Sequence, residues 1–173
     1  GGRLGGGRGR LRAAVDQGAD IVILDGTGHL GDTFADLSGA PDLSLLPRAI
    51  GQMRALKAEE KFPLIWFGGL RSGSDLAKAM ALGANAGIAE VAAALAMGGV
   101  IGQNGTSFPD ADGATAETAL AAFLKAAVSE CSMMARCTGK TDVHNLEPED
   151  LRTLTQAAQK ATGTVMAGLR KSA

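Results

Sequence analysis

The sequence predicts an α/β fold with a parallel sheet, because short apolar runs of strand length alternate with amphipathic helices. The clearest unit begins with the apolar run 62–67, which stops at the paired glycines Gly68 and Gly69. A short polar turn and a helix follow, and the apolar residues of that helix fall on one face. Similar turns, Gly-Ala-Asp at 18–20 and Gly-Ala-Asn at 83–85, close two helices before a strand. Strand, glycine turn and helix in this order are typical of βαβ units.

The first half of the chain is expected to supply a helix, a strand and a second helix. A glycine-rich start leads into a helix over 11–17, which Gly18 ends. The continuous apolar run 20–25 has strand length and is typical of a strand buried on both faces. A glycine loop over 26–31 follows, and apolar residues spaced for a core face predict a helix over 43–59.

The next βα units follow the strand 62–67. The pattern predicts a helix over 75–82, a weaker strand over 86–89 and a short helix over 91–97. Glycine, asparagine and proline break all periodicity from 98 to 114, so this segment is predicted to be a loop. No strand signal appears after Ala89.

The C-terminal part is predicted to be helical. An alanine-rich helix is expected over 116–136, and a second over 148–161 with Leu151, Leu154 and Ala158 facing inward. His144 precedes this second helix and is expected to cap or pack there. The expected organisation is therefore βα units over 1–97, a loop over 98–115 and a helical extension over 116–173.

Charge and composition exclude several classes of partner. The 173 residues include 17 Lys and Arg against 18 Asp and Glu, a net charge of -1, so no bulk field favours nucleic acid or an acidic membrane. We expect no membrane span, because no run approaches the roughly 18 to 20 apolar residues that one needs. No charged-then-apolar signal segment opens the chain. Cys131 and Cys137 are six apart in one predicted helix and do not share a face, so we expect no bridge and a reducing, cytoplasmic setting.

Gly68 and Gly69 form the strongest candidate ligand site. Glycines let the backbone approach a ligand closely, and backbone N–H groups near a helix N-terminus suit a phosphate. The alternative is a plain strand-to-helix turn with Arg71 solvated. The sequence thus predicts the phosphate end of a parallel α/β fold.

Other candidates have a functional and a structural interpretation. Asp25 ends a strand, where functional residues of such folds collect, but its carboxylate could equally cap the following loop. His29 lies in the glycine loop and could donate to a substrate carboxylate or act as an acid, or could be a surface histidine. Trp66 is the single tryptophan and is expected in the core or a pocket wall rather than as a stacking platform.

Three stretches resemble the flavin domain of the glutamate synthase family, whose close relatives include the large subunits of N-methylglutamate synthase. The family motifs are similar to residues 18–26 with the glycine loop, to 67–75 followed by 78–86, and to 135–151. The resemblance implies the C-terminal half of a (β/α)8 TIM-type barrel with a C-terminal helical extension. It would place an FMN phosphate on Gly68 and Gly69, with Arg71 near it.

The same resemblance implies a reductive reaction. Reduced FMN would give hydride to 2-iminoglutarate, formed from 2-oxoglutarate and ammonia or an amine, and the product would be glutamate or an N-substituted glutamate. The loop 26–31, including Gly26 and Gly28, would lie over the flavin ring or the 2-oxoglutarate site. Glutaminase-type and reductase partners would deliver ammonia and electrons.

Three departures from the family pattern bear on this expectation. The chain supplies only three or four strands, so an N-terminal half-barrel or a partner subunit must cover the sheet. Glu90 and Val91 stand where the family has a Gly-Thr or Gly-Ser pair, so the phosphate is held differently or FMN binding is lost. No cysteine lies in the loop 98–114, so we expect no iron–sulphur cluster in this chain.

Two hypotheses of different classes follow. The first is a component of an FMN-dependent, glutamate-synthase-like oxidoreductase. The second is a non-catalytic structural or regulatory subunit of a larger assembly that has lost flavin binding.

Overall fold

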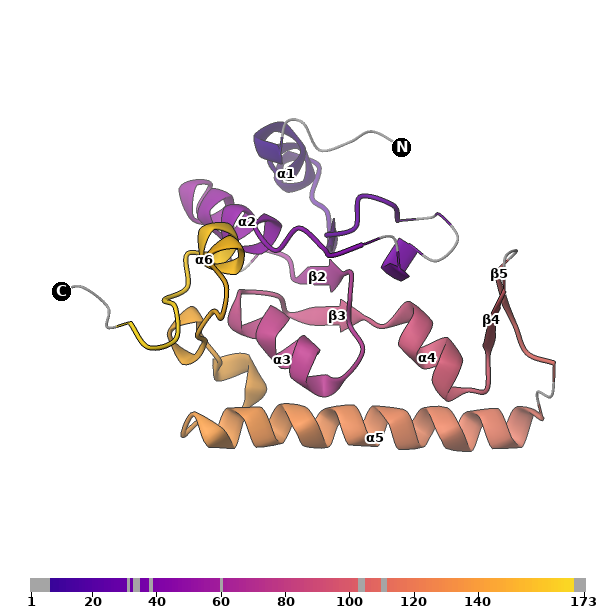
Figure 1. The fold of residues 1–173 in the computed structure, drawn as a ribbon. Helices are drawn as coiled ribbons and strands as arrows, with labels where there is room; N and C mark the ends of the chain where they lie inside the picture. Colours follow the sequence, from indigo (N-terminus) through magenta and orange to yellow (C-terminus); the bar gives the residue numbers. More distant parts are fainter. Residues whose placement is uncertain are drawn as a thin grey trace.

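A computed structural model of the chain describes residues 7–30, 32, 35–37, 39–59, 61–102, 105–109 and 112–169. Three strands form a parallel sheet in the order β1 (Val22–Asp25), β2 (Leu64–Phe67) and β3 (Ala86–Ile88) (Figure 1). Helices α2 (Leu45–Ala55) and α3 (Gly73–Ala81) make the two crossovers between them. The predicted succession of parallel βαβ units is confirmed.

The other elements surround these units. Helix α1 precedes β1, the 3-10 turn η1 lies between β1 and α2, and α4 follows β3; a hairpin, the long helix α5, two 3-10 turns and α6 complete the chain. Their bounds are α1 Gly7–Asp16, η1 Ala35–Leu37, α4 Glu90–Ala96, β4 Val100–Gly102, β5 Gly105–Ser107, α5 Gly113–Cys137, η2 Val143–Asn145, η3 Pro148–Asp150 and α6 Gln156–Thr162.

The main core lies between one face of the sheet and its crossover helices. Leu24, Leu64 and Trp66 belong to one buried cluster with Leu46 and Met53 of α2. The expectation that Trp66 is a core residue is confirmed, since its side chain is fully buried. Its indole N–H donates to the carbonyl oxygen of Gly68 at 2.8 Å, which ties the core to the turn after β2.

The opposite face of β1 is exposed, so the prediction of a strand buried on both faces is wrong. Ile21 and Ile23 are 54% and 46% exposed. Ile23 is in register with Ile65 of β2, which is in register with the exposed Ala86 of β3. We call Ile21, Ile23, Ile65 and Ala86 the open sheet face. Ile65 is half-buried, and Phe67, two residues further along the same side of β2, is buried, so the exposed part of this face lies at Ile21, Ile23 and Ala86.

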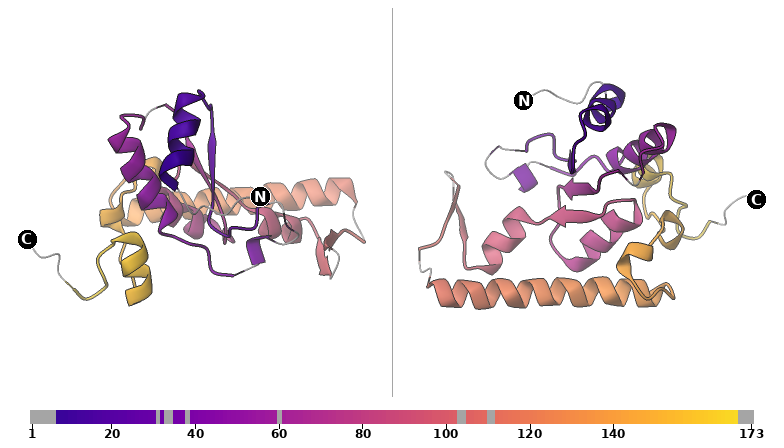
Figure 2. Two further views of the ribbon diagram at one scale, coloured as in Figure 1. Left: turned by 90° about the horizontal axis from the view of Figure 1, so that it is seen from above. Right: turned by 180° about the vertical axis from the view of Figure 1, so that it is seen from behind.

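The helical extension is packed on the βα units through α3. Helix α5 runs along α3, and the view from behind in Figure 2 shows the same arrangement. The Sγ atom of Cys131 donates to the carbonyl oxygen of Gly73 at 3.1 Å, and the backbone N–H of Ser74 donates to the carboxylate of Glu130 at 3.0 Å. Burial, with Glu130 nearby, raises the pKa of the Cys131 thiol. The extension is therefore an integral part of the fold.

Two segments differ from the sequence prediction. Residues 98–114, predicted to be a loop without strands, contain the antiparallel hairpin β4–β5. The helix predicted over 148–161 is divided into η3 and α6, and Leu154 between them is 83% exposed instead of facing inward. The backbone of Thr153 is paired with residues 165–167, an extended arrangement that is incompatible with a continuous helix.

Among the described helices, α5 is long and apolar enough to cross a membrane by length and composition alone. The helix contains charged residues and no run of 18 apolar residues, so the expectation that the chain has no membrane span stays a prediction. One such helix is weak support for a membrane span. Moreover, Glu130 of α5 is hydrogen-bonded to α3, which is a role in the packing of the fold.

Candidate functional site

The parallel topology gathers the predicted site at one edge of the sheet. Asp25 ends β1, Gly68 follows β2 and Glu90 comes two residues after β3. Because the carboxyl ends of parallel strands meet at the same edge, these three positions lie on the side where ligands of such folds bind. The turn η1 lies at the arrowhead end of β2 in Figure 1 and packs against α4.

The turn at Gly68 and Gly69 requires glycine for its backbone. Their φ angles are +134° and +68°, a region that L side chains rarely adopt. A Cβ on Gly68 would also come within 3.2 Å of Pro41 and Thr27. Backbone conformation and close packing against the β1–α2 connection are thus sufficient to explain the two glycines, which agrees with the alternative of a plain strand-to-helix turn.

The turn nevertheless holds an anion, and that anion belongs to the chain itself. The backbone N–H of Gly69 donates to Oδ1 of Asp36 at 2.7 Å. Asp36 lies in η1 and is only 9% exposed. The prediction did not include this residue, because one acidic residue in the polar connection 32–42 carries no signal of which backbone group it meets.

Asp25 caps the loop that follows β1. Its carboxylate accepts hydrogen bonds from the backbone N–H groups of Thr27, Gly28 and Leu30, and from the Thr27 hydroxyl at 2.6 Å. Burial raises the pKa of Asp25, but the hydrogen bonds outweigh it, so the pKa lies below its ordinary value of 3.8. An ionised carboxylate with its acceptor sites occupied matches the loop-capping alternative rather than a proton donor.

The other loop candidates are also engaged within the chain. Nδ1 of His29 lies 3.2 Å from the carboxylate of Asp32, and both side chains are exposed. A Cβ on Gly26 would collide with the ring of Trp66, whereas a Cβ on Gly28 would meet open space. Gly28 has a φ of +71° and supplies one of the N–H groups that cap Asp25. Their roles toward a cofactor stay predictions.

Arg71 lies two residues before α3 and is paired with a carboxylate of that helix. Its Nε donates to Asp75 at 3.1 Å, and Lys78 reaches the other oxygen of Asp75 at 3.3 Å. Burial raises the pKa of Asp75, but Arg71 and Lys78 together lower it below the ordinary value. The Arg71 side chain is 82% exposed, so it is available to a ligand only as a surface cation.

Glu90 and Val91 stand at the start of α4. Glu90 is exposed in the first helical turn, where a negative side chain interacts favourably with the helix dipole, and Val91 is buried. The resemblance to the glutamate synthase family implies a Gly-Thr or Gly-Ser pair in this place, whose N–H groups would receive the phosphate. Here the position carries a carboxylate and a buried β-branched side chain.

As arranged, these residues do not fit the phosphate of FMN. The Gly69 N–H is already taken by Asp36, and α4, which begins at Glu90, packs against the turn that carries Asp36. A phosphate dianion at this N–H would meet the Asp36 carboxylate, and like charges at close range repel strongly in a partly buried site.

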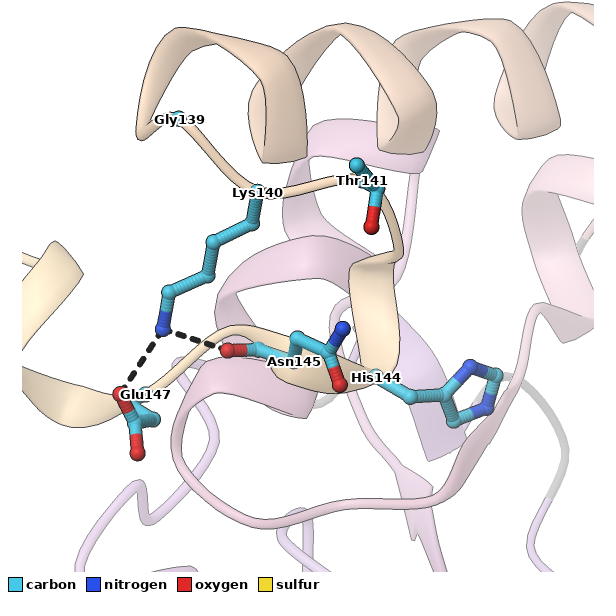
Figure 3. Close-up of a pocket in the computed structure, with 6 residues that line it drawn as sticks. All are labelled: Gly139, Lys140, Thr141, His144, Asn145 and Glu147. Atoms are coloured by element: carbon cyan, nitrogen blue, oxygen red, sulfur yellow. Dashed lines mark hydrogen bonds and ion pairs between the residues drawn. The ribbon is translucent and has the colours of Figure 1, made fainter.

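A hollow lies beyond the C-terminal end of α5, away from the sheet edge (Figure 3). It is an open pocket of about 560 Å³, lined by Gly139, Lys140, Thr141, His144, Asn145 and Glu147. Lys140 donates to the carbonyl oxygen of Asn145, to Glu147 at 2.8 Å and to Asp150 at 2.7 Å. Asp150 and Glu147 raise the pKa of Lys140. The lysine thus links the end of α5 to η3.

His144 donates from its backbone to Asp142, whose carboxylate also lies 3.0 Å from its ring. Asp142 is the cap of η2, and the His144 side chain is exposed, so His144 does not cap or pack as expected. In the described ranges, no group of three or more His, Cys, Asp or Glu side chains gathers as a metal site would require.

The fold is similar to that of solved flavin-binding enzymes. A double mutant of flavocytochrome b2 with pyruvate bound superimposes with a TM-score of 0.62 at 18% identity, covering 95% of this chain and 36% of that one. The recombinant flavin-binding domain of baker's yeast flavocytochrome b2 gives 0.61 at 17%, covering 95% and 35%. (S)-Mandelate dehydrogenase, a monotopic membrane protein, gives 0.59 at 23%, covering 84% and 32%.

These likenesses define the class: the chain has the fold of part of a TIM barrel of the kind found in FMN-dependent oxidoreductases, as predicted. The conserved region of glutamate synthase matches residues 5–105. A glutamate synthase large subunit-like protein of Rhizobium meliloti (strain 1021) is 33% identical over 189 residues, covering 90% of this chain and 43% of that protein. The chain therefore belongs to the glutamate synthase family, and it spans less than half the length of this curated relative.

Proposed function

We propose that the chain is the C-terminal part of the barrel of a glutamate-synthase-like oxidoreductase. The observation that supports this most directly is the family match over residues 5–105, which spans all three parallel strands and the glycine turn at their carboxyl ends. In such barrels the reaction takes place at this edge. The rest of the barrel, from the same polypeptide or from a partner subunit, would cover the open sheet face.

The complete protein would reduce 2-iminoglutarate, formed from 2-oxoglutarate and ammonia or an amine, to glutamate or an N-substituted glutamate. The imine carbon gains a hydride and the nitrogen a proton, so two electrons must come from outside. FMN is the electron carrier expected from the family. Glutaminase-type and reductase partners and a cytoplasmic setting belong to the same proposal.

Asp36 and Glu90 favour a second candidate, a structural or regulatory subunit that no longer binds flavin. Both carboxylates belong to elements at the strand ends, and one of them occupies the N–H of Gly69. A site that has lost its ligand tolerates such replacements, whereas a working phosphate site is penalised by them.

The two candidates are separated by the visible absorption spectrum of the full-length protein purified with any co-purifying partner. Stoichiometric FMN, identified by chromatography after denaturation, together with oxidation of the reduced flavin on adding 2-oxoglutarate and ammonia, supports the oxidoreductase. A colourless complex that takes up no added FMN supports the second candidate.

A further inference from the structure

We propose that Asp36 is a built-in anion that occupies the phosphate-binding turn, so that Gly69 accepts an external phosphate only where the Asp36 carboxylate is absent. This inference concerns the turn alone and stands whether or not the complete protein is an oxidoreductase.

The geometry of Asp36 is that of a bound anion. The N–H···O distance to Gly69 is 2.7 Å, at the short end of the range for hydrogen bonds to an ionised oxygen. The side chain is almost buried, and no described Lys, Arg or His side chain forms an ion pair with it. A nearly buried carboxylate needs hydrogen-bond donors, and the turn supplies one through the Gly69 N–H.

The contact joins two elements far apart in the chain. Asp36 and Gly69 are separated by 33 positions. Pro41 belongs to the same connection as Asp36 and lies beside Gly68 and Gly69, 3.2 and 3.3 Å from where a Cβ on each glycine would be. A phosphate that accepted a hydrogen bond from the Gly69 N–H would have to share this donor with the Asp36 carboxylate. Since a single backbone N–H directs only one strong hydrogen bond, the two anions exclude each other.

The second carboxylate adds to this exclusion. Helix α4 begins at Glu90 and packs against η1, so a phosphate at the turn would approach a second negative charge as well. Glu90 is exposed and solvent screens it, whereas Asp36 is nearly buried. We therefore assign the larger part of the effect to Asp36.

The test compares FMN with riboflavin, which lacks the phosphate, on the full-length protein. The variants are Asp36→Asn, which removes the charge and keeps the shape, and Asp36→Ala, which also frees the N–H. The matched control is Asp42→Asn, because Asp42 is an exposed aspartate in the same β1–α2 connection, and its carboxylate accepts hydrogen bonds from its neighbour Ser44. Melting curves and circular dichroism establish that each variant is folded.

We expect both Asp36 variants to bind FMN at least about tenfold more tightly than the wild type, with riboflavin affinity unchanged and Asp42→Asn equal to the wild type. Inorganic phosphate should compete with FMN in the variants. An equal gain for riboflavin, or no gain in either variant, overturns the inference.

The same FMN-binding measurements test the proposed function through different outcomes. If the wild type already holds stoichiometric FMN and Asp36→Asn binds it no more tightly, this inference fails and the oxidoreductase proposal stands. If only the Asp36 variants take up FMN, the inference is supported and the wild-type chain is the non-catalytic candidate.

Discussion

At the scale of single residues, the carboxylates of the sheet edge are directed at backbone N–H groups of the chain. Asp25 receives three such groups after β1, and Asp36 receives that of Gly69 after β2. Buried or partly buried N–H donors are costly to leave unpaired, so an acidic side chain nearby stabilises a loop that lacks regular secondary structure. The same donors are those that a ligand anion would use.

Asp25→Ala should lower the free energy of unfolding by about 1 to 2 kcal/mol, because it removes the acceptor of four hydrogen bonds at once. Asp32→Ala is the control, since among the described residues the exposed Asp32 side chain has the ring of His29 as its partner. Denaturant unfolding of both variants measures the difference. Equal losses in the two variants would contradict a special role of Asp25.

The contribution of Asp25 should also depend on pH with a definite sign. Its pKa in the folded protein lies below the ordinary value of 3.8, so folding favours the ionised form. The stabilisation is complete above about pH 5 and is lost as the pH falls below 3.8, through the folded pKa. The stability difference between wild type and Asp25→Asn should therefore shrink in acid; a difference that grows would contradict the assignment.

At the scale of elements, the closest approach is between α3 and α5. A Cβ on Gly73 would lie 2.0 Å from the carbonyl oxygen of Ala127, so the two helices meet at backbone distance. Ala77, Ala81, Cys131 and Leu146 form a second buried cluster around this contact. The absence of a side chain at Gly73 is what lets the helical extension pack on the βα units.

Gly73→Ala should therefore separate the two helices and destabilise the protein by about 1 to 3 kcal/mol, as overpacking does in a core. Gly113→Ala, at the first position of α5, is the matched control, because its Cβ would meet open space. Since alanine favours a helix, that variant should be neutral or up to about 1 kcal/mol more stable. Thermal unfolding compares the two; similar melting temperatures would argue against close packing at Gly73.

At the scale of the whole molecule, the open sheet face is the main unsatisfied feature. Isoleucines at positions 21 and 23 point away from the core, and β1 and β3 are the edges of a three-stranded sheet. An exposed apolar row beside open strand edges promotes association. This agrees with a chain that spans less than half of its curated relative.

The 173-residue chain expressed alone should therefore self-associate through this face. Ile23→Lys should weaken that association by about tenfold or more, because burial of an isoleucine side chain contributes about 1.5 to 3 kcal/mol. Leu154→Lys is the control, since Leu154 is more exposed but lies outside the open sheet face. Sedimentation velocity over a concentration series measures both, and a wild-type chain that is monomeric throughout would contradict the prediction.

The candidate site shows which of its features local sequence patterns predict and which they do not. The glycine pair after β2 and the aspartate at the end of β1 were predictable, because a strand end followed by glycine is a local pattern. The partner of Gly69 was not, because the contact with Asp36 depends on how the connection after β1 folds back over the strand ends. Likewise, Leu154 has helical spacing, but the pairing of Thr153 with a segment beyond α6 divides the expected helix.

The alternation of strands and helices, the parallel sheet and the glycine turn follow from the sequence alone, because periodicity and turn patterns lie within short windows. The family was suggested by the resemblance of three stretches. The partner of Gly69, the exposed face of β1 and the close approach of α5 to Gly73 became known from the folded structure. Those contacts form between segments that are distant in the chain, and local propensity does not predict contacts of that kind.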